Sequence, residues 1–122
     1  MRQIKYILID DHGTSQANHY TINHNGNIVE NIGIRKPVNV INRTIDPDGY
    51  NSNSVVILCK ELDRPICSAA LKDLLVKLRH HFPDAKIFGT SEIGEYFIKV
   101  SGEMNRLRFE LSELSKDSDP VM

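Results

Sequence analysis

The chain has little cysteine, no long apolar run and no excess of either charge, and each absence excludes a class of protein. Cys59 and Cys67 are the two cysteines, too few for a disulfide framework, and we expect both thiols to be reduced and buried. No apolar stretch approaches the ~20 residues of a transmembrane helix. The apolar residues 6–9 are stopped by Asp10. We therefore expect no signal peptide, and a cytoplasmic location for the chain as given.

The charge balance argues against nucleic-acid and membrane partners. The net charge is −1 over 122 residues, which provides neither a basic surface for nucleic acid nor a polybasic membrane patch. Hydrophobic residues make up 40% and charged residues 25%, as in ordinary globular proteins. The length predicts one domain, which we assign to residues 1–116. Residues 117–122 lack apolar content and are predicted to form a disordered tail.

The motifs that usually mark catalytic sites are also missing. No glycine-rich phosphate loop, no C-x-x-C and no H-x-x-x-H on a predicted helix occurs. Neither cysteine has a histidine nearby in the sequence to activate it. Asp10, His12 and His19 surround the end of one predicted strand and the start of the next, and such a set can hold zinc. They are weak metal candidates, and residues 12 and 19 fit ordinary structural roles as well.

Periodicity predicts an α/β domain with a mixed sheet. Asn25-Gly26 is typical of a hairpin turn between two strands. Pro37 limits a short strand at Val38, Val40 and Ile41 to a sheet edge. The other predicted strands are short apolar or alternating runs bounded by turn residues; they comprise residues 4–9, 19–23, 27–32, 54–59, 85–89 and 95–100.

Two helices are predicted after the fourth of these strands. Residues 65–82 place leucines and a phenylalanine on one helical face, with Pro65 suited to the first turn and Pro83 ending the helix. A second stripe predicts a helix over residues 103–115. The stripe residues are Leu71, Leu74, Leu75, Leu78 and Phe82 in the first helix, and Met104, Leu107, Leu111 and Leu114 in the second.

The stretch "GYNSNSVVILC", residues 49–59, resembles a family. It is similar to the zinc-dependent N-acetylmuramoyl-L-alanine amidases of the phage-lysozyme type, which share a fold with the peptidoglycan recognition proteins. In that family a GYN-x-NS turn leads into a central strand. The strand at residues 4–9, "NHYTINHNGNIVE" (18–30) and the helix, turn and strand of 62–89 resemble family segments in the same order. The resemblance covers roughly residues 3–100.

The resemblance also implies that the family's zinc chemistry is lost. Asp10 stands where the family has its first zinc histidine, and Asn18 stands where it has a catalytic tyrosine. Thr90 replaces the second zinc histidine, and no cysteine follows Cys67 to serve as the third ligand. A hydrolytic zinc needs three protein ligands and one open position. We therefore expect no zinc cofactor and no catalytic residue.

The implied architecture is a single amidase-like domain, a central mixed sheet packed by helices, with the family's first helix deleted. Seven residues, 11–17, separate Asp10 from Asn18, too few for a helix and two connections. The resemblance places the residue 49–54 loop beside the former zinc cleft. Polar side chains around that cleft are then candidates for a binding groove; they are Asp10, Asn18, Asn51, Asn53, Thr90 and Glu92.

Three functions remain open at this point. The first is a catalytically degenerate, non-hydrolytic module that binds peptidoglycan fragments or a protein. The second is an N-acetylmuramoyl-L-alanine amidase with a relocated site built from Asp10, His12 and His19. The third is a structural or interaction domain without a ligand, which offers an exposed sheet edge to a partner. The resemblance bears on fold, and fold alone does not choose among these functions.

Overall fold

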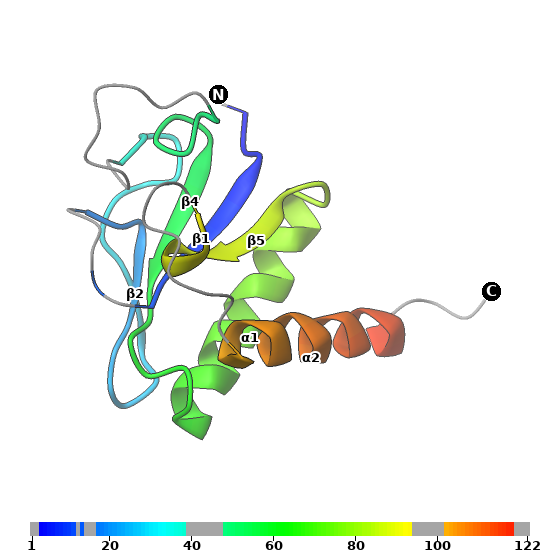
Figure 1. The fold of residues 1–122 in the computed structure, drawn as a ribbon. Helices are drawn as coiled ribbons and strands as arrows, with labels where there is room; N and C mark the ends of the chain where they lie inside the picture. The colour runs from blue at the N-terminus through cyan, green and yellow to red at the C-terminus, as the bar shows by residue number, and fades with distance from the viewer. Residues whose placement is uncertain (1–2, 12, 14–16, 39–47, 94–101, 119–122) are drawn as a thin grey trace.

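A computed structural model describes residues 3–11, 13, 17–38, 48–93 and 102–118 of the chain. Its strands and helices form an α/β domain, in which four strands precede the first helix (Figure 1). The elements are β1 (Tyr6–Asp10), β2 (Tyr20–Ile22), β3 (Ile28–Glu30), β4 (Ser54–Leu58), α1 (Pro65–His81), β5 (Lys86–Gly89), a 3₁₀ turn (Thr90–Glu92) and α2 (Gly102–Ser118).

The five strands form one mixed sheet in the order β3-β2-β4-β1-β5, which confirms the predicted α/β class. β1 pairs in parallel with both β4 and β5, and β2 pairs in parallel with β4. Only β3 runs antiparallel, to β2. Tyr6 lies opposite Ser54, and Asp10 lies opposite Leu58. The carboxyl ends of β1, β4 and β5 therefore lie at the same end of the sheet.

The predicted hairpin joins β2 to β3. The Asn23 N–H donates to the Asn27 carbonyl at 2.9 Å, and the Gly26 N–H donates to the Asn23 carbonyl at 2.8 Å. Gly26 has a φ of +84°, a conformation that glycine adopts without steric cost. A β-carbon there would also lie 2.7 Å from Cγ1 of Ile66. Glycine is therefore required at position 26 both by its backbone conformation and by the close approach of α1.

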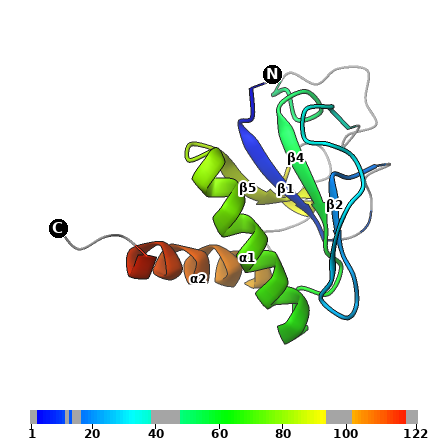
Figure 2. The ribbon, with the colours of Figure 1, turned by 180° about the vertical axis from the view of Figure 1, so that it is seen from behind.

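The helices pack against one face of the sheet. Ile7, Ile9, Val55 and Ile57 point to that face and are fully buried. In Figure 2, α1 lies across this face and α2 crosses beside it. The predicted leucine stripe of α1 and the stripe of α2 complete this core together with Cys67; the stripe residues buried in it are Leu71, Leu74, Leu75, Leu78, Met104, Leu107 and Leu111.

The other face of the sheet is covered mainly by connecting segments. Leu8 and Val56 point to it and pack with Val38 and Ile93. Tyr6 and its neighbours Tyr50 and Phe88 extend this smaller cluster, with the rings of Tyr6 and Tyr50 4.8 Å apart. Because β1 and β4 are buried on both faces, their sequences are continuous apolar runs, as in buried parallel strands generally.

Several predicted boundaries differ from the observed ones. Helix α1 ends at His81, one residue before the predicted end, and Phe82 caps it through an N–H bond to the Leu78 carbonyl. Helix α2 continues to Ser118, through the first two residues of the predicted tail; residues 119–122 lie outside the described part. The predicted strand at 95–100 and residues 40 and 41 also lie outside it. Val38 is buried but belongs to no strand.

Both cysteines are free thiols and both are buried, which confirms the expectation from the sequence. Burial, with a smaller contribution from Cys67, raises the pKa of Cys59 to about 11, so this thiol stays protonated at neutral pH and is a poor nucleophile. The Cys67 thiol donates to the Asn23 carbonyl, with Sγ and O 3.3 Å apart. Within the described residues, neither helix is long and apolar enough to cross a bilayer.

Leu75 tests the core beneath α1. Replacing this fully buried side chain with alanine removes apolar contacts and leaves a cavity, so we expect Leu75→Ala to lower the free energy of unfolding by about 2–5 kcal/mol. Urea denaturation followed by circular dichroism measures the change. The neighbouring Val76 is 40% exposed, and Val76→Ala is expected to shift stability by only about 0.5 kcal/mol. Equal losses would contradict this packing.

Candidate functional site

Polar side chains meet where β1 and β5 end. Asp10 is the last residue of β1, and Thr90 follows the last residue of β5. Because these strands are parallel neighbours, both residues lie at the same end of the sheet, where the strands end. The Thr90 hydroxyl lies 3.2 Å from Oδ1 of Asp10. Asp10 is fully buried and Thr90 nearly so.

The next residue of each segment extends this contact. Oδ1 of Asp11 lies 3.4 Å from the Thr90 hydroxyl, and Oδ2 accepts a hydrogen bond from the Ser91 hydroxyl at 3.1 Å. Thr90 has one hydroxyl proton, so at any moment it donates to one of the two carboxylates. Asp11 is only half-buried. We call Asp10, Asp11, Thr90 and Ser91 the strand-end cluster; it presents carboxylate oxygens that accept hydrogen bonds, with Asp11 nearest to solvent.

Glu92 lies beside this cluster but is held by an arginine. Nη1 and Nη2 of Arg108 donate to the two carboxylate oxygens of Glu92 at 2.7 and 2.8 Å, and the Gly89 N–H donates to Oε1 at 2.8 Å. Burial acts to raise the pKa of Glu92, but the bonds from Arg108 and Gly89 outweigh it, and the pKa is lowered. Hydrogen bonding to Glu92 raises the pKa of Arg108.

This ion pair also closes the outer edge of β5. The Lys86 N–H bonds the Lys5 carbonyl of the segment that leads into β1, so Ile87 and Gly89 direct their backbone groups away from β1. Arg108 donates to the Ile87 carbonyl at 3.3 Å, and Glu92 accepts from the Gly89 N–H. An edge strand with such groups open would be a template for pairing with another chain. Glu92 therefore has a structural role at the sheet edge.

The residue 49–54 loop lies at the opposite end of the sheet. The Asn53 carbonyl accepts hydrogen bonds from the N–H groups of Lys5 and Tyr6, at 2.8 and 3.2 Å. Asn53 in turn donates its N–H to Gly49, which has a φ of +75°. The loop thus ties the start of β4 to the start of β1.

That position corrects the expectation that this loop forms a wall beside Asp10 and Thr90. β1 and β4 are parallel, so a loop that precedes β4 lies where β1 begins, whereas Asp10 lies where β1 ends. Five-residue strands separate those two ends by about 13 Å. Asn51 and Asn53 therefore stay near the start of the strands, and they do not join the strand-end cluster.

Asn18 belongs to the hairpin side of the sheet. Its Oδ1 accepts a hydrogen bond from the Thr21 hydroxyl at 2.9 Å and another from Nδ2 of Asn31 at 2.7 Å. β4 lies between β2 and β1 in the sheet, so this polar trio is separated from Asp10 by a strand. Of the six groove candidates, the structure brings Asp10 and Thr90 into contact and places Glu92 beside them.

The metal candidate His19 is bound on both ring nitrogens by backbone groups. The Val56 N–H donates to Nδ1 at 3.0 Å, and Nε2 lies 2.7 Å from the Lys36 carbonyl. Nδ1 is therefore an acceptor, and Nε2 carries the proton that bonds Lys36. A metal could bind this fully buried ring only by breaking one of these bonds. His12 lies outside the described residues, and the described residues contain no group of three potential ligands arranged for a metal ion.

The groove predicted from the sequence did not include Asp11, Ser91 or Arg108. Asp10 and Asp11 are paired acids at the end of a predicted strand, a pattern that fits either catalytic acids or ordinary turn residues, so the pair alone did not assign Asp11 to the groove. Ser91 adjoins Thr90 in the sequence, but nothing there shows that its hydroxyl meets Asp11. Arg108 lies 16 residues beyond Glu92, and no local pattern links the two.

Comparison with known proteins identifies no significant similarity to this chain. No protein-family model matches the chain, and no curated protein or solved structure is significantly similar to it.

His19 tests whether the imidazole is a structural bridge. His19→Ala leaves the buried Val56 N–H without its partner and removes the link to Lys36, so we expect a loss of about 2–4 kcal/mol in the free energy of unfolding. Urea denaturation measures it. His80 is exposed at the end of α1, and His80→Ala is expected to change stability by about 0.5 kcal/mol or less. A folded His19→Ala protein of unchanged stability would contradict the bridge.

Glu92→Gln tests the ion pair at the β5 edge. The substitution keeps the shape but removes the charge that Arg108 binds, and we expect a loss of about 1–3 kcal/mol at pH 7. Because the pKa of folded Glu92 lies below its ordinary value of 4.5, its stabilisation is complete above that pH and is lost as the pH falls through the folded pKa. The gap between wild type and variant should therefore shrink below about pH 4.5.

Unfolding midpoints of both proteins from pH 7 to pH 3 measure that gap. Glu110→Gln is the matched control, because Glu110 pairs with Lys72 between the two helices but is 38% exposed. Solvent screens such a pair, so this control should lose less stability at pH 7. A gap for Glu92→Gln that stays constant down to pH 3 would contradict the assignment.

Proposed function

We propose that this chain is a catalytically degenerate, amidase-like domain that binds peptidoglycan fragments without hydrolysing them. The observation that supports it is the contact between Asp10 and Thr90, 3.2 Å apart. The resemblance gives these two positions to zinc histidines, so it requires them to lie together at the ends of neighbouring strands. They do so, although 80 residues separate them in the sequence.

The chemistry of the strand-end cluster favours binding over hydrolysis. A threonine hydroxyl does not replace an imidazole as a ligand of hydrolytic zinc, and the Thr90 hydroxyl is directed at carboxylate oxygens. Carboxylates accept hydrogen bonds from sugar hydroxyls and peptide N–H groups, both of which a peptidoglycan fragment carries. Asp11 is half-buried, so it is the member of the cluster best placed to meet such a ligand.

The two other functions draw less support from the described residues. A relocated amidase site would need His19, whose ring nitrogens both face backbone partners. An interaction domain would need an accessible sheet edge, and β3 offers one, with Ile28 and Val29 each 41% exposed. That edge is a reason to keep a protein partner as the second candidate.

Titration with N-acetylmuramoyl-L-alanyl-D-isoglutamine tests the proposal. Isothermal calorimetry should show saturable binding to the wild type, and Asp11→Asn should weaken it by about tenfold, because the acceptor of the hydrogen bond loses its charge. Asp84 is exposed in the turn after α1, and Asp84→Asn should leave the affinity unchanged. A folded protein that gives no binding heat, or equal weakening by both variants, would overturn the proposal.

The absence of hydrolysis needs its own measurement. We expect no release of the peptide from the muramoyl group during prolonged incubation of the wild type with the same compound, with or without added Zn²⁺. Mass spectrometry of the reaction mixture detects the free peptide. Zinc-dependent release at a rate that follows enzyme concentration would favour the relocated amidase instead.

A further inference from the structure

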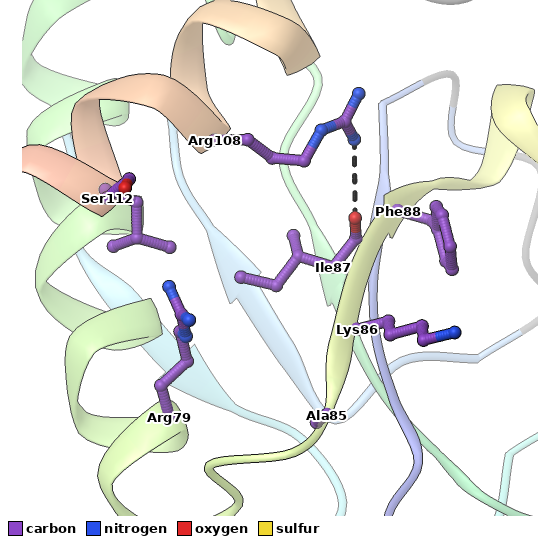
Figure 3. Close-up of a pocket in the computed structure, with 8 residues that line it drawn as sticks. Arg79, Ala85, Lys86, Ile87, Phe88, Arg108 and Ser112 are labelled. Atoms are coloured by element: carbon purple, nitrogen blue, oxygen red, sulfur yellow. Dashed lines mark hydrogen bonds between the residues drawn. The ribbon is translucent and has the colours of Figure 1, made fainter. Parts of the chain in front are cut away.

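A cavity of about 500 Å³ lies between α1, β5 and α2, on the helical side of the sheet edge. Its volume falls within the roughly 300–1,000 Å³ of small-molecule sites. Figure 3 shows Arg79 of α1 and Arg108 of α2 on either side of Ile87. The side chains of Lys86 and Phe88 extend from the other side of β5.

The cavity has an apolar floor. Ala85, Ile87 and Leu111 line it, and each of them is buried in the fold. Ile87 extends from β5 toward the space between the two helices (Figure 3). An apolar group of a ligand could therefore replace water over this floor, which favours burial at about 25 cal/mol per Å² of apolar surface.

The polar lining carries positive charge and no negative charge. None of the eight lining residues is acidic, whereas Arg79, Lys86 and Arg108 are cationic. Arg108 is already neutralised by Glu92, and it also bonds Ile87 and Asn105. Arg79 differs, since it forms no ion pair or side-chain hydrogen bond with any described residue. Arg79 as a whole residue is half-buried, and its charge has no partner among the described residues.

We propose that this cavity binds a small organic carboxylate, with the carboxylate on Arg79 and a compact apolar group over Ile87 and Leu111. A guanidinium presents two parallel N–H donors that match the two oxygens of a carboxylate. Arg108 and Ser112 line the same cavity, and the Ser112 hydroxyl supplies a further donor at its rim. The cavity lining contains no member of the strand-end cluster, so this proposal can be tested independently of peptidoglycan binding.

Benzoate is the probe, because it joins a carboxylate to a compact apolar ring. In ¹⁵N-resolved NMR titrations of the whole chain, benzoate should shift the amide signals of Ile87, Leu111 and Ser112 saturably. Benzamide has the same ring and no charge, so it should bind at least about tenfold more weakly, as expected when a charge-assisted hydrogen bond is lost. Phenyl phosphate carries the same ring on a phosphate group, which a guanidinium also binds, so tighter binding of phenyl phosphate than of benzoate would assign the site to phosphate esters instead.

Two variants and one control decide the assignment. Arg79→Gln should weaken benzoate binding by at least about tenfold, and Ser112→Trp should block the cavity without changing its charge. Arg106 lies on α2 with its side chain 65% exposed and outside the cavity lining. Arg106→Gln makes the same charge change and should leave benzoate affinity unaltered.

The alternative role of Arg79 is to interact with the carboxyl end of α1, whose last turn also contains His80 and His81. That role would lower the melting temperature of Arg79→Gln without any benzoate effect. The proposal is overturned if benzoate causes no saturable shift, if benzamide binds equally well, if phenyl phosphate binds more tightly, or if Arg79→Gln and Arg106→Gln weaken binding equally. Ser112→Trp tests the cavity even if Arg79→Gln proves unstable.

Discussion

The parallel pairing of β1 with β4 on one side and β5 on the other governs the placement of the polar side chains in this domain. Asp10 lies opposite Leu58, and Ile9 lies opposite Gly89. That register carries Thr90 and Ser91 to the two carboxylates that end β1. It also sends the loop before β4 to the other end of the sheet. A strand direction, rather than any single residue, thus separates the strand-end cluster from the residue 49–54 loop.

Burial on both faces stabilises that pairing and allows only one register between the strands. Ile7 and Ile9 pack under the helices, while Leu8 packs beneath the connecting segments on the opposite face. A slip of one residue would exchange these two sets. His19 adds a further constraint, since its ring joins the N–H of Val56 in β4 to the carbonyl of Lys36. The polar residues near the sheet are therefore mostly engaged in holding strands and segments together.

The edges of the sheet are treated differently. At β5, Arg108 and Glu92 engage the outward carbonyl of Ile87 and the outward N–H of Gly89. At β3, the residues are exposed, and Ile28 and Val29 present apolar side chains. The α2 helix provides the arginine for the first edge and also a wall of the cavity beside it. Closure of the β5 edge and formation of that cavity thus depend on the same helix.

Much of the fold could be predicted from the sequence because its signals are local. The leucine spacing of residues 71–78 predicted α1, Asn25-Gly26 predicted the hairpin turn, and the apolar runs predicted β1 and β4. The resemblance placed Asp10 and Thr90 in one site, and they do lie in contact. The resemblance also put Asn51 and Asn53 beside them, because it placed the residue 49–54 loop by analogy with the family and did not take into account the direction of β4, which follows the loop.

The sequence by itself determined where the two helices and the five strands of the sheet lie, since spacing along the chain decides which face of an element is apolar. Only the tertiary structure decided which polar groups meet. The contacts of Thr90 with Asp10, of Ser91 with Asp11 and of Arg108 with Glu92 join residues 16 to 80 positions apart. They depend on strand order, strand direction and helix position, which are properties of long-range packing and leave no local pattern.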